Sequence, residues 1–230
     1  MNINLKMTTK VEEAAGFMAD SILSQLKTGR QVLFFVTGGS SIAVGAKVSE
    51  LLRNSPERNL IKNITVMMTD ERYGPLDHPD SNWYQQMQKG FSLPGAKLIP
   101  ILDGSDRAST TLKFNANLSR ELMDDKEKRY KIGLFGIGAD GHTSGILPGS
   151  EAVNSEDLAY GYDTPTFSRV TITPKVIEKL DEVVVWVQGK EKWGVVKDLL
   201  EKDIEILKQP AQILKKVPIL TIFSDYDGKR

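Results

Sequence analysis

The chain has 230 residues, 40% of them hydrophobic, which is long enough to bury one sizeable core. Thirty Lys and Arg residues balance thirty Asp and Glu residues, so no overall positive field favours nucleic acid or an anionic membrane. The lack of cysteine excludes disulfides, a thiol nucleophile and thiolate-bound zinc. No signal-peptide pattern or membrane-length apolar run is present, so we expect one cytoplasmic domain, residues 1–230, without nucleic-acid or membrane partners.

Seven short β-branched or aromatic runs predict strands, and the first four start roughly 33 residues apart, which is the spacing of βαβ units. The runs at 32–36 and 183–187 are apolar on both faces, as in strands that are covered by helices on both sides. We therefore predict a doubly wound α/β fold, with a mostly parallel sheet and helices on both faces. The expected strands are Gln31–Thr37, Ile64–Thr69, Lys97–Ile101, Lys131–Gly136, Arg169–Thr173, Glu182–Gln188 and Pro218–Phe223.

Helix signals lie between these runs. Thr9 and Glu12 have the spacing of a capping box, apolar residues follow at helical spacing as far as Leu26, and Gly29 ends the pattern. Thr173 followed by Pro174 predicts an N-cap with proline at the first helical position. The other helices are expected after Ser41, after Ser81, at 107–126 and at 190–202.

A glycine-rich turn follows the first predicted strand and leads directly into a helix. Its backbone N–H groups, its hydroxyls and the helix N-terminus can together bind a phosphate, although an ordinary glycine turn with a serine N-cap fits the same residues. No Gly-Lys-Ser or Gly-Lys-Thr follows, so the turn is not a Walker A loop. The residues of this predicted cradle are Gly38, Gly39, Ser40 and Ser41.

The second strand ends in three ionisable residues, Asp70, Glu71 and Arg72. Such a group at the carboxyl end of a strand is placed for catalysis or binding, because ligands of open α/β sheets collect there. A surface salt bridge from Arg72 to one of the two acids explains the segment equally well.

The fourth strand leads into a glycine-rich loop that contains Asp140 and His142. The neighbouring acid can set the tautomer of the imidazole, which makes His142 the candidate general base. The loop formally matches G-x-G-x-x-G, but Pro148 and Gly149 follow too soon for the helix of a dinucleotide site. The other histidine, His78, has no such context and is expected to be structural.

Two further basic residues are candidate phosphate ligands. Arg169 begins a predicted strand, and Lys192 lies at the start of a predicted helix. A cation at a helix N-terminus opposes the macrodipole unless an anion lies nearby, so Lys192 favours an anion site, whereas Lys190 is expected to be solvated.

Taken together, these segments resemble the family of 6-phosphogluconolactonase and glucosamine-6-phosphate isomerase/deaminase. The similarity runs through most of the chain. It implies a doubly wound α/β fold of the isomerase and CoA-transferase-like kind. The deaminase branch usually has a glutamate where this chain has Leu147, and Asp70-Glu71-Arg72 looks like the lactonase branch. The chain departs from the usual pattern at Ile42, where a proline is usual, and in the segment that precedes Pro148.

The resemblance implies hydrolysis of 6-phospho-D-glucono-1,5-lactone by a monomer or small homo-oligomer, with no cofactor and no metal. His142 would be the base, with Asp140 or Asp70 orienting it or the attacking water. Arg72, Arg169, Lys192 and the turn at 38–41 would hold the phosphate. The alternatives are glucosamine-6-phosphate deaminase/isomerase and a non-catalytic sugar-phosphate sensor.

Overall fold

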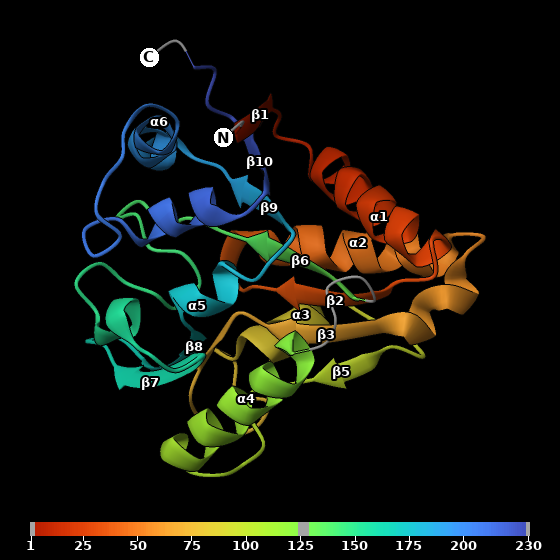
Figure 1. The fold of residues 1–230 in the computed structure, drawn as a ribbon, viewed down its shortest axis with the longest axis horizontal. Coiled ribbons are helices and arrows are strands. Elements are labelled where there is room, and N and C mark those ends of the chain that lie inside the picture. The colour runs from red at the N-terminus through yellow and green to blue at the C-terminus, as the bar shows by residue number, and fades with distance from the viewer. Residues whose placement is uncertain (1–2, 124–128, 229–230) are drawn as a thin grey trace.

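The computed structural model describes residues 3–123 and 129–228. These residues form two sheets and six α-helices, together with short 3₁₀ turns (Figure 1). The strands are β1 (Ile3–Met7), β2 (Gln31–Val36), β3 (Ile64–Met68), β4 (Asp70–Arg72), β5 (Lys97–Ile99), β6 (Arg129–Phe135), β7 (Ala159–Asp163), β8 (Ser168–Ile172), β9 (Glu182–Val187) and β10 (Ile219–Ser224). The helices are α1 (Val11–Lys27), α2 (Ile42–Asn54), α3 (Asn82–Gln88), α4 (Arg107–Leu122), α5 (Pro174–Ile177) and α6 (Trp193–Glu201).

The larger sheet is parallel throughout, in the order β1-β10-β9-β6-β2-β3-β5. From β2 the chain runs outward to β3 and β5, and it then returns to the other side of β2 at β6. The order therefore reverses between β2 and β6, and the loops that leave these two strands diverge there. In open α/β sheets such a switch point opens a crevice at the carboxyl ends of the strands, and ligands bind in it.

Helices cover both faces of the parallel sheet, as predicted. Right-handed crossovers place α1, α2 and α3 on one face and α4, α5 and α6 on the other. In agreement, α1 packs on α2 and α2 packs on α3, whereas α4 packs on β7 and β8 (Figure 1). The inner strands β3, β6 and β9 are mostly apolar and are buried along their whole length, because each lies between two helical layers. No helix in the described part of the chain is long and apolar enough to cross a membrane.

One predicted strand lies in a different sheet from the one expected. The 169–173 run forms β8, which pairs antiparallel with β4 and β7 in a three-stranded sheet. The prediction was wrong because alternation along a single strand does not identify its neighbours. The same sheet shows that Asp70–Arg72 is itself a short strand and not a loop. Strand β4 follows β3 directly after Thr69, so the small sheet begins at the carboxyl end of the large sheet.

The predicted capping box was also wrong. Helix α1 begins at Val11 with Lys10 as its N-cap, and no side-chain cap is formed. The Thr8 hydroxyl accepts the Lys10 N–H at 3.0 Å, so a local turn takes the place of the box and helix entry shifts by one residue. Strands β1, β4 and β7 were not predicted. The helix expected at 107–126 ends at Leu122, and the part of the prediction that covers 124–126 lies outside the described residues.

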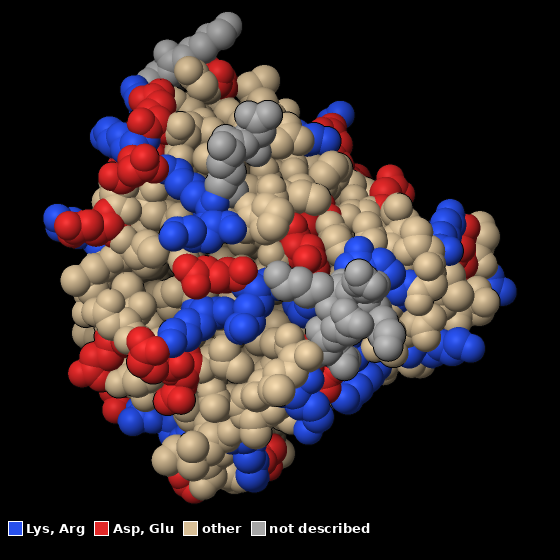
Figure 2. Space-filling model, in the orientation of Figure 1, with Lys and Arg blue, Asp and Glu red and all other residues tan. Residues whose placement is uncertain are grey.

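Other boundary signals are confirmed. The Ser81 side chain accepts the Tyr84 N–H and caps α3, and Pro174 occupies the first turn of α5. The helix expected at 190–202 is a 3₁₀ turn over Lys190–Lys192 followed by α6. On the face seen in Figure 2, acidic and basic side chains are interspersed over the surface, in keeping with the balanced charge.

Candidate active site

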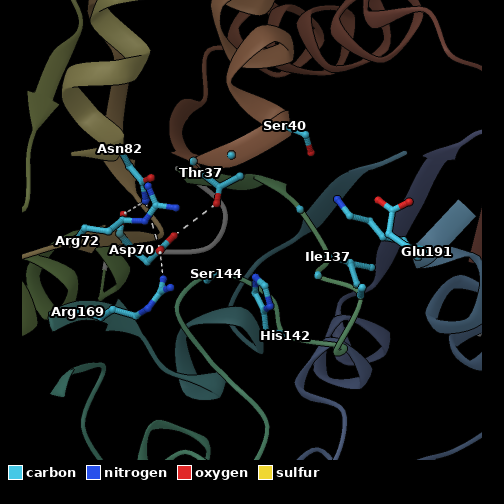
Figure 3. A pocket seen from close by; sticks show the side chains of 16 residues that line it. Thr37, Ser40, Asp70, Arg72, Asn82, Ile137, His142, Ser144, Arg169 and Glu191 are labelled. Carbon is cyan, nitrogen blue, oxygen red and sulfur yellow. Dashed lines mark hydrogen bonds and ion pairs between the residues drawn. The ribbon is translucent and has the colours of Figure 1, made fainter. Parts of the chain in front are cut away.

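A cavity of about 450 Å³ lies at the switch point, where loops from both sheets converge (Figure 3). It draws residues from the β2–α2 turn, from β4 and β8, from the start of α3, from the loop after β6 and from the 3₁₀ turn before α6. The lining residues are Thr37, Gly38, Gly39, Ser40, Asp70, Arg72, Asn82, Gly136, Ile137, Gly138, Ala139, His142, Ser144, Arg169, Glu191 and Lys192. Eight of the ten residues predicted from sequence are therefore brought to one cavity, and Asp140 and Ser41 are the exceptions.

The loop after β6 presents His142 to the cavity. The Gly138 N–H donates to the His142 carbonyl at 3.0 Å, and the Gly141 N–H donates to the Gly138 carbonyl at 3.0 Å. Gly141 has φ of +84°, and a Cβ there would lie 2.5 Å from Gln209, so glycine is required for this turn. The turn is held against the chain before β10, where the Ala211 N–H donates to the Gly141 carbonyl.

Asp140 orients the imidazole. Nδ1 of His142 lies 2.6 Å from Oδ1 of Asp140, and the same oxygen accepts the His142 backbone N–H at 3.1 Å. A carboxylate only accepts hydrogen bonds, so Nδ1 carries a proton and Nε2 is the ring nitrogen left to exchange one. Partial burial raises the pKa of Asp140, but the backbone hydrogen bond and the charge and hydrogen bond of the ring outweigh it, so this pKa lies below its ordinary value.

Gly138 makes room for this pair. A Cβ at Gly138 would lie 2.1 Å from Nδ1 of His142 and 2.6 Å from Oδ1 of Asp140. We expect Gly138→Ala to displace the ring and to lower kcat about 10- to 100-fold, because small misplacements of reacting groups are costly. The free energy of unfolding should change little, since the atoms that must move belong to partly exposed side chains. Steady-state kinetics and urea unfolding measure the two effects.

Gly16 provides a matched control for this substitution. It lies inside α1, and a Cβ there would meet nothing within 4 Å. Gly16→Ala should keep full activity and gain about 0.5–1 kcal/mol of stability from helix propensity. Full activity in Gly138→Ala would show that the ring does not need its observed position.

Two arginines face each other across β4 and β8. Arg72 and Arg169 are register partners. The adjacent hydrogen bonds, from the Tyr73 N–H to the Ser168 carbonyl and from the Ile172 N–H to the Thr69 carbonyl, make them a non-hydrogen-bonded pair. Side chains approach most closely in such pairs, and like charges there are destabilising. This arrangement suits a dianion that both guanidinium groups bind.

Asp70 supports this side of the cavity and does not contact His142. Its Oδ2 lies 3.8 Å from the Arg169 guanidinium and accepts the Asn82 side-chain amide at 3.3 Å. Its Oδ1 accepts the Thr69 hydroxyl at 3.0 Å. Asp140, and not Asp70, is therefore the acid that holds the imidazole. The salt bridge considered between Arg72 and its neighbouring acids does not form, because Arg72 donates to the Asp80 carbonyl and Glu71 points into the protein.

Glu71 joins β4 to the start of α3. Its carboxylate is fully buried and accepts hydrogen bonds from the Ser81 hydroxyl and from the backbone N–H groups of Arg72, Asn82 and Trp83. Burial raises the pKa of Glu71 above its ordinary value, although these four hydrogen bonds act in the opposite direction. Glu71 thereby sets the position of Arg72 relative to Asn82.

The glycine turn after β2 contributes through its first three residues. Gly38 lies against the Asn82 amide, where a Cβ would come within 2.0 Å of Oδ1. Ser41 is fully buried, and its hydroxyl donates to the Phe135 carbonyl at 3.4 Å. Ser41 was expected among the phosphate ligands, but it packs beneath the cavity because the 3₁₀ turn at Gly39–Ser41 rotates its side chain inward. Lys192 also lines the cavity, at the start of α6 as predicted.

Four buried polar atoms of the lining residues have no hydrogen-bond partner within the described chain: Arg72 Nε, Arg169 Nε, Asn82 Oδ1 and Ser144 Oγ. Buried polar groups are normally paired, so this concentration in one cavity indicates a polar ligand site. Ser144 also has φ of +52°, a strained value that clusters at functional sites.

Sequence reasoning missed Thr37, Asn82, Ser144 and Glu191 as lining residues. Asn82 lies directly after Ser81, where the sequence predicted only the start of a helix. His78 is structural, as expected, with Nε2 lying 2.8 Å from the Arg72 carbonyl. No group of three His, Asp or Glu side chains that could hold a metal ion occurs among residues 3–123 and 129–228.

The fold and site define a doubly wound α/β protein whose switch point holds a cavity lined by basic side chains and by an acid-oriented histidine. Residues 6–221 match the family described as glucosamine-6-phosphate isomerases/6-phosphogluconolactonase. The chain belongs to this family.

Individual relatives agree with this assignment. A 6-phosphogluconolactonase of Haemophilus influenzae is 27% identical over 202 residues, covering 84% of this chain and 83% of its own. The crystal structure of a 6-phosphogluconolactonase from Thermotoga maritima has a TM-score of 0.81 at 21% identity, covering 96% and 98% of the two chains. A monomeric glucosamine-6-phosphate deaminase has a TM-score of 0.76 at 21% identity, covering 96% and 97%. The fold is thus common to both branches of the family.

Proposed function

We propose that this protein hydrolyses 6-phospho-D-glucono-1,5-lactone to 6-phosphogluconate, the hydrolytic step of the oxidative pentose phosphate pathway. The observation that carries the proposal is the single cavity in which an acid-oriented imidazole and a facing pair of arginines meet. A phosphorylated lactone needs both, because its phosphate requires cations and its ester carbonyl requires an activated water.

In the proposed mechanism, Nε2 of His142 removes a proton from a water molecule, which attacks the lactone carbonyl carbon. The tetrahedral intermediate then collapses, the bond between the carbonyl carbon and the ring oxygen breaks, and the imidazolium returns the proton to that oxygen. Asp140 stabilises the imidazolium between these two steps. The open-chain acid ionises, so each turnover releases one proton.

The phosphate would be held by Arg72 and Arg169, with Lys192 and the turn at 38–40 completing its binding. Asp70 would act as a positioning residue, because it contacts Arg169 and Asn82 and not the imidazole. The phosphate takes no part in the reaction, so its binding energy can be used to hold the lactone carbonyl in place next to the attacking water.

The deaminase alternative shares the fold but not the local sequence. The position at which deaminases usually carry a glutamate is Leu147, which cannot exchange protons with an amino sugar. A non-catalytic sensor would have no use for a histidine whose ring is oriented by Asp140.

The test is to add the protein to freshly prepared 6-phosphogluconolactone and to follow acid release at constant pH. We expect rapid acid release above the spontaneous rate, and no ammonia from glucosamine 6-phosphate. Ammonia release without lactone hydrolysis would establish the deaminase, and tight binding of both sugar phosphates without turnover would establish a sensor.

A further inference from the structure

Phe167 lies against both arginines of the facing pair. The guanidinium carbon of Arg72 is 5.2 Å from the centre of the Phe167 ring, and that of Arg169 is 5.5 Å from it. Both distances fall within the range of a cation–π interaction. A single aromatic ring therefore contacts the two cations that the proposed function assigns to the phosphate.

The register of the small sheet explains this contact. Phe167 precedes Arg169 by two residues, so the two side chains leave the chain on the same side, and Arg72 lies directly across from Arg169. Phe167 is thus the diagonal neighbour of Arg72, at a separation that aromatic and long side chains can bridge. The backbone of Phe167 is fixed by Thr164, because the Phe167 N–H donates to the Thr164 hydroxyl and the Phe167 carbonyl accepts the Thr164 N–H.

The arginines need such a partner because little else fixes them. Among the described residues other than Phe167, the Arg72 side chain donates to the Asp80 carbonyl, and the Arg169 guanidinium forms a long ion pair of 3.8 Å with Asp70. Their Nε atoms are buried without a hydrogen-bond partner in the described chain. Without the ring, mutual repulsion would drive the two guanidinium groups apart before the anion arrives, and binding would have to reassemble them.

We propose that Phe167 is a positioning residue that holds Arg72 and Arg169 together in the orientation in which they bind the substrate phosphate. The inference rests on the proposed function for the identity of the substrate, but its central claim concerns phosphate binding alone. The ring does not touch the reacting atoms, so its effect must appear in phosphate affinity and KM and not in kcat.

The experiment compares Phe167→Leu, which keeps apolar bulk but loses the ring, with Phe167→Tyr, which keeps the ring. Calorimetry measures the Kd of inorganic phosphate, and kinetics are measured with 6-phosphogluconolactone and with unphosphorylated glucono-1,5-lactone. We expect Phe167→Leu to raise both the phosphate Kd and the KM of the phosphorylated lactone about fivefold, with kcat nearly unchanged. Phe167→Tyr should behave as wild type, and hydrolysis of the unphosphorylated lactone should be unaffected.

Phe17 is the matched control, because its ring lies 4.3 Å from the ammonium of Lys6, on α1 and outside the cavity. Phe17→Leu should leave the phosphate Kd at the wild-type value. Unchanged phosphate Kd and KM in Phe167→Leu would overturn the inference, and so would an equal loss of activity on both lactones, which would indicate a structural role. If the wild-type protein does not hydrolyse the lactone but Phe167→Leu still weakens phosphate binding, the proposed function fails and the inference stands.

Discussion

His142→Ala should lower kcat for 6-phosphogluconolactone by about 10² to 10⁴, the usual contribution of a general acid–base residue. The structure gives the reason: the Asp140 carboxylate accepts the proton of Nδ1, which leaves Nε2 as the base, and alanine removes this base entirely. KM should change little, because the imidazole is not assigned to the phosphate. Initial rates of acid release over a range of lactone concentrations separate the two parameters.

Chemical rescue provides the control for this substitution. The His142 side chain is 38% exposed, so small molecules can reach the space that alanine would leave. Imidazole added to His142→Ala should restore part of kcat, whereas it should not accelerate the wild-type enzyme. Unfolding curves of the variant should match wild type. Full activity in His142→Ala would refute the proposed mechanism.

Arg169→Ala should raise KM for the phosphorylated lactone about 10- to 100-fold, because hydrogen bonds to charged groups are each worth about 1.5–3 kcal/mol. Arg169 is nearly buried, with its side chain 12% exposed, and its ion pair with Asp70 is long, at 3.8 Å. The change in kcat should be small by comparison. Kinetics with glucono-1,5-lactone, which lacks the phosphate, should show no corresponding loss.

Arg107 is the matched control for Arg169. It lies at the start of α4, pairs with Asp163 and donates to the Ser168 hydroxyl at 2.7 Å, next to Arg169 but outside the cavity. Arg107→Ala should therefore leave KM near the wild-type value. An equal rise in KM in both variants would mean that the effect comes from disturbance of the small sheet and not from a lost phosphate contact.

The parallel sheet could be predicted because its signals are local. Runs such as Val32–Val36 and Val183–Val187 are apolar on both faces, and only strands covered on both sides bury such runs completely. The small sheet could not be assigned in the same way. Strand β4 has three residues with three ionisable side chains, and β8 has the same alternation whether its neighbours are parallel or antiparallel.

The site was predictable where its residues follow strands of the parallel sheet. The turn after β2 and the loop with His142 had to meet, because β2 and β6 are neighbours whose carboxyl ends lie at the same edge. The choice between Asp140 and Asp70 was left open, since both follow such strands. The inward rotation of Ser41 and the roles of Asn82 and Phe167 depend on contacts that no local pattern specifies.

The sequence by itself determined the class of fold, the balance of charge, and the two glycine-rich loops, one of which carries His142. These features could be predicted because composition, periodicity and glycine positions act over short stretches of chain. Only the tertiary structure decided that Arg72 and Arg169 face each other, that Asp140 holds the imidazole and that Asp70 does not. The arginine pairing and the place of Asp70 depend on strand register and on packing between segments about a hundred residues apart, as the Asp70–Thr171 partnership illustrates. Asp140 and His142 are only two residues apart, but Asp70 could be set aside as the partner of His142 only from the folded loop. Such contacts are set by the energy of the whole folded chain and not by any one segment.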